Sequence, residues 1–321
     1  MSIKQDILIN TCDAETRVAL LENRRVEEIF IERHGNLGLV GNIYLGKVVR
    51  VLPGMQSAFI EIGLERTAFL HVADMAIATH SPTASQTTVN QLPPIETQLF
   101  DGQTVLVQVI KDPIGTKGAR LSTKISIAGR LLVYLPKEEG VGVTQKVDSD
   151  EERIALKNQM NELLGDTPDG GYIIRTAALD AAVEEWQNDI NYLKRTWQEI
   201  NEQKRKRSAP TLIHRDLTLA QRVLRDMVTQ DTQSVICDNA DTLQQLQAFA
   251  QTYMPSVLPR LKLAPVERPL FDTYEVEEEI NRSLQHRVDL KSGGYLIIEQ
   301  TEAMTTIDVN TGRFIGKGKS L

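Results

Sequence analysis

The fold of the first third of the chain is decided by Ile43-Tyr-Leu-Gly-Lys-Val-Val-Arg-Val-Leu52, Ser57-Ala-Phe-Ile-Glu-Ile62 and Ala68-Phe-Leu-His-Val72. β-Branched and aromatic residues dominate each run, and Pro and Gly turn residues separate the runs. The pattern resumes at Gln103-Thr-Val-Leu-Val-Gln-Val-Ile110 and ends near Ala119-Arg-Leu-Ser122. Five short strands with Gly-marked turns, in such a short stretch, are typical of a small closed barrel of the OB type.

The flanking segments mix strands with helices. Three β-branched runs precede the barrel, at 6–10, 16–21 and 27–32. Beyond it, the pattern predicts helices over 153–164, 218–230, 242–253 and 274–285, with strands over 170–176, 234–238, 295–300 and 304–312. The length of 321 residues corresponds to about two domains, which favours more than one compact unit. The sequence therefore predicts an α+β protein of several domains.

One long amphipathic helix is predicted between the barrel and the C-terminal third. A single apolar stripe recurs at intervals of three and four residues through Val183, Trp186, Ile190, Leu193, Trp197 and Ile200. We expect this stripe, including its two tryptophans, to pack in a core. The helix is expected to end at the basic run 204–207, which is interpreted as a solvated helix end.

Composition excludes several classes of protein. The chain has 36 Lys and Arg against 43 Asp and Glu, so its net charge of -7 argues against a histone-like polyanion binder. No apolar run approaches the length of a membrane span, and the N-terminus lacks the apolar core of a secretory signal. The two cysteines, Cys12 and Cys237, lack the spacing of a disulfide framework or a zinc site. We therefore expect a reduced, cytoplasmic protein without a membrane segment.

Asp308 and Asn310 are the candidate metal ligands. Residues i and i+2 of a strand share a face, so both side chains are expected to point the same way at the end of the last predicted strand. A carboxylate and an amide oxygen suit a hard cation such as magnesium. No Asp or Glu follows Asp308. The alternative is ordinary turn chemistry, because Asp-x-Asn-x-Gly is also common where a strand ends in a turn.

Two aromatic residues of the barrel are candidates for binding nucleic acid. Phe59 and Phe69 lie on consecutive predicted strands, with cations at Lys47, Arg50 and Lys117 nearby. Aromatic faces surrounded by cations form stacking platforms for single-stranded bases. The alternative, which spacing alone leaves open, is that both rings belong to the barrel core.

Several stretches resemble landmarks of the bacterial ribonuclease E/G family and occur in the same order. They are Val40-Gly-Asn-Ile-Tyr-Leu-Gly-Lys-Val48, Val51-Leu-Pro-Gly-Met-Gln-Ser-Ala-Phe-Ile-Glu-Ile-Gly63, Ala68-Phe-Leu-His71, Ser126-Ile-Ala-Gly-Arg-Leu-Leu-Val133, Ile174-Arg-Thr-Ala177 and Thr306-Ile-Asp-Val-Asn-Thr-Gly312. The resemblance runs from end to end, and the short insert after the third barrel strand favours the ribonuclease G branch.

The resemblance implies an architecture. Residues 1–39 and 212–282 would form an RNase H-like domain, which is split by the inserted segments. Residues 40–125 would be an OB-type barrel of the S-one kind, and residues 126–211 a subdomain that senses the 5′ end of RNA. Residues 283–321 would begin a DNase I-like catalytic domain.

The resemblance also implies site residues. Asp308 would be a catalytic magnesium ligand, and Asn310 the neighbour that orients the site. Phe59, Phe69 and Lys117 would contact RNA. The pocket for a 5′-monophosphate would comprise Gly129, Val133, Arg175 and Thr176. In that pocket, the guanidinium of Arg175 would clamp phosphate oxygens while the Thr176 hydroxyl completes the cradle.

The implied activity is magnesium-dependent cleavage of single-stranded RNA, with a preference for 5′-monophosphate ends, in RNA decay and ribosomal RNA maturation. Family members form homo-oligomers, continue into a second aspartate ligand, and then carry a cysteine motif that binds zinc between subunits. Because this sequence lacks both features, we expect a truncated chain that binds RNA and cleaves it weakly or not at all. The alternatives are a non-catalytic RNA-binding module and a general OB-type protein without end preference.

Overall fold

The computed structural model describes residues 4–76, 92–165, 169–179 and 181–312. It is a mixed α+β structure with two compact units, Met1–Gly35 with Val228–Leu321, and Asn36–Met227. The insert predicted from Thr79 to Pro94 falls largely outside the described residues. Within the described ranges, no helix combines the length and the apolar character that a bilayer crossing requires.

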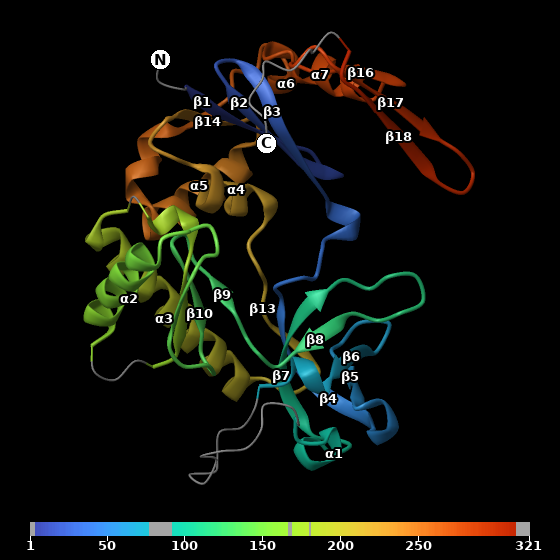
Figure 1. The fold of residues 1–321 in the computed structure, drawn as a ribbon, viewed down its shortest axis with the longest axis vertical. Coiled ribbons are helices and arrows are strands. Elements are labelled where there is room, and N and C mark those ends of the chain that lie inside the picture. The colour runs from blue at the N-terminus through green and yellow to red at the C-terminus, as the bar shows by residue number, and fades with distance from the viewer. Residues whose placement is uncertain (1–3, 77–91, 166–168, 180, 313–321) are drawn as a thin grey trace. The chain divides into compact units, whose positions relative to one another are not determined.

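The Asn36–Met227 unit contains a closed five-stranded barrel, which confirms the prediction from sequence. The strands follow the order β4-β5-β6-β8-β7, and the pairing of β7 with β4 closes the barrel (Figure 1). β13 adds to the outside edge of β4. The bounds are β4 Ile43–Leu52, β5 Ser57–Glu61, β6 Ala68–His71, β7 Thr104–Lys111, β8 Arg120–Ser122 and β13 Thr211–His214, with the short α1 at Ile95–Gln98.

Alternation along β5 determines which side chains face solvent. Ala58 and Ile60 are fully buried in the barrel core, whereas Phe59 and Glu61 point outward. Gly46 on β4 faces this strand, and a Cβ atom there would lie 2.5 Å from Cγ2 of Ile60. The glycine therefore permits the close crossing of strands that a small barrel requires.

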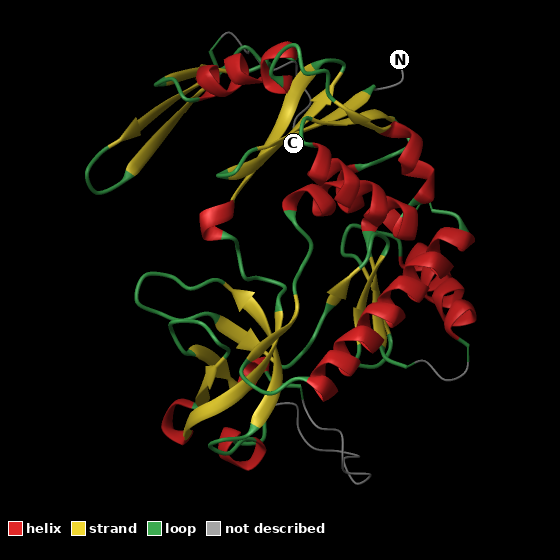
Figure 2. Ribbon diagram, turned by 180° about the vertical axis from the view of Figure 1, so that it is seen from behind, coloured by secondary structure: helices red, strands yellow, loops and turns green. Residues whose placement is uncertain are grey.

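A second, four-stranded sheet in the same unit packs against a long helix. The strand order is β11-β12-β10-β9, and Figure 2 shows helix α3 lying along the sheet. Trp186, Ile190, Leu193 and Ile200 of α3 are buried in one core with this sheet, so most of the predicted stripe is confirmed. The bounds are β9 Ile127–Ala128, β10 Leu132–Leu135, β11 Val141–Val143, β12 Gly171–Ile174, α2 Asp150–Leu164, α3 Val183–Lys206 and α4 Leu219–Met227.

The other unit is built on a five-stranded sheet with the order β15-β14-β1-β2-β3. β1 pairs parallel with β14 and antiparallel with β2, and a small core cluster around Leu8, Leu21 and Phe271 lies against the sheet. The bounds are β1 Gln5–Thr11, β2 Glu15–Glu22, β3 Arg25–Arg33, β14 Thr232–Cys237, β15 Leu261–Leu263 and α5 Ala240–Tyr253.

The C-terminal part of this unit contains the helix predicted over 274–285. That prediction is confirmed by α7 Val276–Ser283, which is shorter at both ends, and the separate short helix α6 Leu270–Thr273 precedes α7. Glu275 separates them because its φ of 58° places it in the left-handed region, which does not continue a right-handed helix. A three-stranded antiparallel sheet follows, with β16 Arg287–Asp289, β17 Tyr295–Gln300 and β18 Thr305–Asn310.

Candidate RNA-binding and catalytic sites

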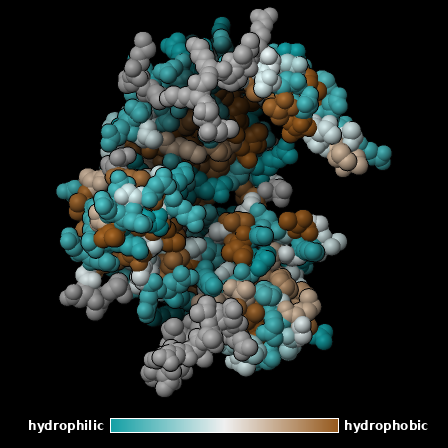
Figure 3. All heavy atoms as spheres, in the orientation of Figure 1, coloured by the Kyte–Doolittle hydropathy of each residue, from teal (hydrophilic) through white to brown (hydrophobic). Residues whose placement is uncertain are grey.

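The aromatic pair of the barrel lies at its surface. Phe59 of β5 and Phe69 of β6 are register partners, with ring centroids 6.2 Å apart in an edge-to-face arrangement. Phe59 is 36% exposed and Phe69 is half-buried. Neither ring is a core residue, so the structure favours the stacking interpretation over the alternative. Figure 3 shows hydrophobic side chains reaching the surface where the barrel strands lie.

Cationic side chains flank this pair on neighbouring strands and loops. Arg50 of β4 is the register partner of Phe59, and its side chain is exposed. Lys117 is also exposed and lies in the β7–β8 loop, where its backbone pairs with Ile114. Arg66 donates to the carbonyl of Gly115 and so ties this loop to the start of β6. Rings and cations that share one exposed region are the combination that single-stranded nucleic acid requires.

A pocket of about 370 Å³ opens beside the four-stranded sheet of the same unit. Arg175 and Thr176, which the resemblance assigns to the 5′-monophosphate pocket, follow β12 directly and line it. Gly129 and Val133 are not among its lining residues. Val133 instead pairs with Ile173 across the sheet. The lining comprises Arg130, Thr144, Lys146, Ile173, Ile174, Arg175, Thr176, Ala177 and Asp226.

Hydrogen bonds hold the guanidinium of Arg175 in place. Its Nη1 donates to the carbonyl oxygen of Gly129 at 2.5 Å and to Oδ1 of Asp226 at 2.8 Å. Arg225 holds the same carboxylate through two bonds, Nε to Oδ1 at 3.0 Å and Nη2 to Oδ2 at 2.9 Å. Burial acts to raise the pKa of Asp226, but the hydrogen bonds and charges of Arg225 and Arg175 outweigh it, so this pKa is lowered. Asp226 is therefore an anion that orients Arg175.

Two further polar side chains complete the wall of the pocket. The hydroxyl of Thr176 lies 3.4 Å from the hydroxyl of Thr144. Lys146 is exposed, and within the described part of the chain its ammonium makes no ion pair. An arginine, a lysine and two hydroxyls around one pocket are suited to bind a phosphate group. Sequence reasoning missed Lys146, Thr144 and Asp226, because each comes from a different segment and none stands in a recognisable local motif.

Gly129 supports Arg175 from the loop between β9 and β10. It begins a loop whose next three amide groups, those of Arg130, Leu131 and Leu132, donate to the carboxylate of Asp189 at 3.0, 2.9 and 2.9 Å. A Cβ atom on Gly129 would lie 2.6 Å from Oδ1 of that carboxylate. Burial raises the pKa of Asp189, while the three amide donors oppose this effect. The glycine thus lets the loop approach α3 and present its carbonyl to Arg175.

Asp308 and Asn310 lie on one face of the edge strand β18, as predicted. Nδ2 of Asn310 donates to Oδ2 of Asp308 at 2.9 Å, and the Asp308 carboxylate is exposed. Across the strand pair, Asp308 is opposite Ile297, and Glu299 is opposite Thr306 on the same face. Oε1 of Glu299 accepts a hydrogen bond from Nε2 of His286 at 3.0 Å. Among the residues that the structure describes, no three His, Cys, Asp or Glu side chains converge as a metal site.

The comparisons with known proteins agree with this arrangement. Residues 126–320 match the model of the ribonuclease E/G family, which is more than half of the chain. The chain therefore belongs to the ribonuclease E/G family. It is similar to ribonuclease G of Haemophilus influenzae, 44% identical over 311 residues, and to ribonuclease G of Escherichia coli K12, 43% identical over 311 residues. In both comparisons the match covers 97% of this chain and 63% of the relative.

The ribonuclease E branch is more distant. The chain is 35% identical to ribonuclease E of Escherichia coli K12 over 311 residues, which are 96% of this chain and 29% of that protein. The higher identity to ribonuclease G agrees with the branch that the sequence favours.

Proposed function

We propose that this protein is a magnesium-dependent endoribonuclease that cleaves single-stranded RNA and prefers 5′-monophosphate ends. Its roles would be RNA decay and ribosomal RNA maturation in the cytoplasm. The observation that carries the proposal is that one compact unit holds both an exposed aromatic pair and a polar pocket around Arg175. The first suits unpaired bases, and the second suits a terminal phosphate. The names of the relatives supply the reaction class.

The proposed magnesium site is centred on Asp308. One exposed carboxylate fits the usual environment of protein-bound magnesium, in which one or two carboxylates act beside water and substrate phosphates. Asn310 would orient this carboxylate through the observed hydrogen bond. The ion, when bound, would polarise a phosphoryl oxygen and lower the pKa of the attacking water. We also propose that the remaining domains are RNase H-like and DNase I-like, and that the protein forms homo-oligomers.

Replacement of Phe59 by alanine should weaken the binding of short single-stranded RNA by about 1–3 kcal/mol, the contribution of one base stacked on an aromatic ring. Because the ring is partly exposed, the free energy of unfolding should fall by less than the roughly 3–5 kcal/mol that follows truncation of a core phenylalanine. Fluorescence anisotropy with a labelled eight-nucleotide RNA measures the first quantity, and urea unfolding measures the second.

The matched control is Phe100→Ala, which removes a more exposed aromatic side chain that is not part of the pair. It should leave RNA affinity unchanged. Equal affinities for the unmutated chain and Phe59→Ala would show that the aromatic pair does not bind bases.

Cleavage by the 321-residue chain should be weak or absent even where RNA binding is strong. The reason is that Asp308 supplies one carboxylate, and the described residues around it offer no cluster of further ligands. This observation also favours the second candidate function, a non-catalytic RNA-binding module. The test is a cleavage assay on a 5′-monophosphorylated, A/U-rich RNA with magnesium, using the chain and its Asp308→Ala variant. Robust magnesium-dependent turnover that Asp308→Ala abolishes would contradict this expectation.

A further inference from the structure

A second pocket lies at the base of the barrel, apart from the aromatic pair and from the pocket at Arg175. Its volume is about 320 Å³, which is in the lower range of pockets that hold small ligands. Three segments of the same unit form it, namely the stretch that leads into β4, the turn after β5, and β13 with its flanks. The lining residues are Leu37, Gly38, Leu39, Asn42, Tyr44, Ile62, Gly63, Leu64, Pro210, Thr211, Leu212 and Arg215.

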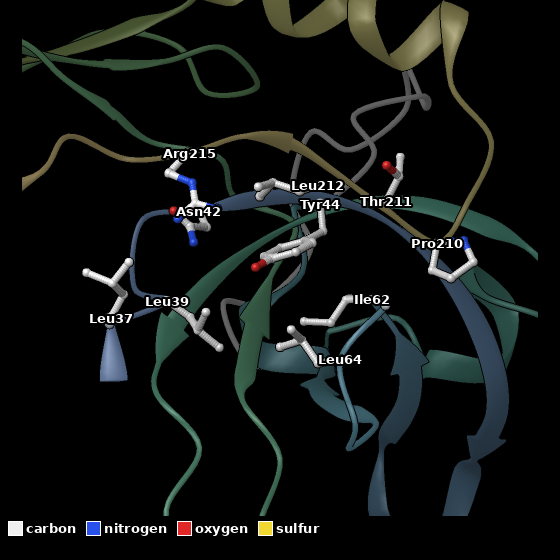
Figure 4. A pocket seen from close by; sticks show the side chains of 12 residues that line it. Leu37, Leu39, Asn42, Tyr44, Ile62, Leu64, Pro210, Thr211, Leu212 and Arg215 are labelled. Atoms are coloured by element: carbon white, nitrogen blue, oxygen red, sulfur yellow. The ribbon is translucent and has the colours of Figure 1, made fainter. Parts of the chain in front are cut away.

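An aromatic ring and aliphatic walls form the apolar part of this pocket. Tyr44 of β4 is a register partner of Leu212 on β13, and its side chain is almost fully buried. Figure 4 shows the Tyr44 ring in the middle of the group, with its hydroxyl directed toward the side of Asn42 and Leu39. Leu37 and Leu64 are 38% and 37% exposed, so aliphatic surface at the pocket remains in contact with solvent. Because Tyr44 is only 5% exposed, a flat base would rest on this aliphatic surface and meet Tyr44 at its hydroxyl edge.

Three polar groups at the pocket have unused hydrogen-bonding capacity. Oδ1 of Asn42 accepts from the amide of Asp216 at 2.8 Å, which fixes the side chain and leaves Nδ2 without a partner in the described structure. The hydroxyl of Tyr44 and the exposed guanidinium of Arg215 likewise have no hydrogen-bond partner among the described residues. The neutral amide of Asn42 and hydroxyl of Tyr44 can form hydrogen bonds with a base, and the cation of Arg215 can bind a phosphate. Together these three groups match a nucleotide.

The walls are held in place independently of any ligand. The amide of Leu39 donates to Oδ1 of Asp112 at 2.6 Å, which anchors the segment before β4 to the barrel. Asp216 packs against Gly41, whose φ of 92° is in the glycine-favouring region. These two carboxylates are not among the residues that line the pocket. Arg215 is therefore the charged residue that the pocket presents.

The chain just after β5 relates this pocket to the aromatic pair. Ile62, which lines the pocket one residue beyond β5, follows Phe59 by three residues, a separation of about 10 Å along an extended chain, and its side chain is on the opposite face from Phe59. We propose that the pocket binds one nucleotide, with the base against Tyr44 and a phosphate at Arg215. The inference rests on the proposed function where the nucleotide belongs to an RNA strand. A free mononucleotide has the same chemistry and is the other source.

The experiment compares 5′-AMP and adenosine as probes, with isothermal titration calorimetry on the full chain. Arg215→Ala should weaken 5′-AMP binding roughly tenfold and leave adenosine binding unchanged, because only the phosphate contact is lost. Tyr44→Phe should weaken both probes about three- to tenfold, because the hydroxyl contacts the base in each. Arg205→Ala, which removes another exposed arginine of this unit, is the matched control and should change neither affinity.

A competing eight-nucleotide single-stranded RNA distinguishes the two sources. Displacement of 5′-AMP by the RNA, together with weaker RNA binding in Arg215→Ala, identifies a nucleotide within a strand. Binding of 5′-AMP that RNA does not displace identifies a free mononucleotide. RNA binding that depends on Phe59 but not on Tyr44 or Arg215, with no binding of 5′-AMP, overturns the pocket assignment alone. Binding of 5′-AMP without any RNA binding overturns the proposed function and leaves the pocket assignment standing.

Discussion

Replacement of Asp189 by alanine is expected to lower the free energy of unfolding by about 3–5 kcal/mol. Its buried carboxylate accepts the amides of Arg130, Leu131 and Leu132, and no other described side chain replaces it. The variant would leave these amide groups without a partner inside the protein, and each unsatisfied donor costs about 1–3 kcal/mol. The midpoint and slope of urea unfolding, followed by circular dichroism, measure the change.

Two further variants of α3 sharpen this test. Asp189→Asn keeps one acceptor oxygen but turns an amide group toward a backbone N–H. The free energy of unfolding of this variant should therefore lie between that of the unmutated chain and that of Asp189→Ala. Asn188→Ala removes an exposed neighbour and should change the unfolding free energy by no more than about 0.5 kcal/mol. If Asp189→Ala were as stable as Asn188→Ala, the loop would not depend on this carboxylate.

Arg175→Ala should remove any preference for RNA with a 5′-monophosphate. Nη1 of Arg175 is held by Gly129 and Asp226, which leaves Nη2 and Nε as donors for a ligand. Hydrogen bonds to charged groups contribute about 1.5–3 kcal/mol, so affinity for the phosphorylated end should fall roughly 10- to 150-fold. Affinity for the same RNA with a 5′-hydroxyl should not change. Anisotropy titrations of both RNAs, with the variant and the unmutated chain, measure the four affinities.

Arg175→Lys separates charge from geometry. Lysine keeps the positive charge but lacks the planar fork of donors, so it should restore little of the preference. Both variants remove the guanidinium of Arg175 from Asp226, but Arg225 remains a partner of this carboxylate. Urea unfolding of both variants checks that the free energy of unfolding has not fallen. An unchanged preference in Arg175→Ala would show that the phosphate binds elsewhere.

Regular elements could be predicted from the sequence because their signals are local. The run from Ile43 to Leu52 is rich in β-branched and aromatic residues and ends at the Pro53-Gly54 turn, and it forms β4 with the same bounds. The stripe through Trp186 and Ile190 follows the helical period and is buried in α3. The left-handed Glu275, which makes α7 begin at Val276, has no such signal, because a glutamate is ordinarily a good helix former.

The sites were predictable only in part, because they are assembled from distant segments. The resemblance placed Arg175 and Thr176 at a pocket, but Lys146 and Asp226 reach it from positions remote in the sequence. The resemblance assigns Gly129 to phosphate binding, which stays a prediction, and the structure adds that this glycine lies against Asp189. Asp189 itself lies next to the apolar stripe of α3, and its three amide partners depend on tertiary contact. The spacing of residues in the sequence did not decide whether Phe59 is exposed. In the structure, the strand register of the barrel places Phe59 on the outer face of β5.

We propose that the Asn36–Met227 unit binds single-stranded RNA and recognises its 5′ end. The most direct test is the affinity of the unmutated chain for one eight-nucleotide, A/U-rich RNA with either a 5′-monophosphate or a 5′-hydroxyl. We expect the monophosphorylated RNA to bind more tightly, by roughly tenfold or more, because the phosphate gains a charge-assisted contact with Arg175. Equal affinity for the two RNAs would contradict it.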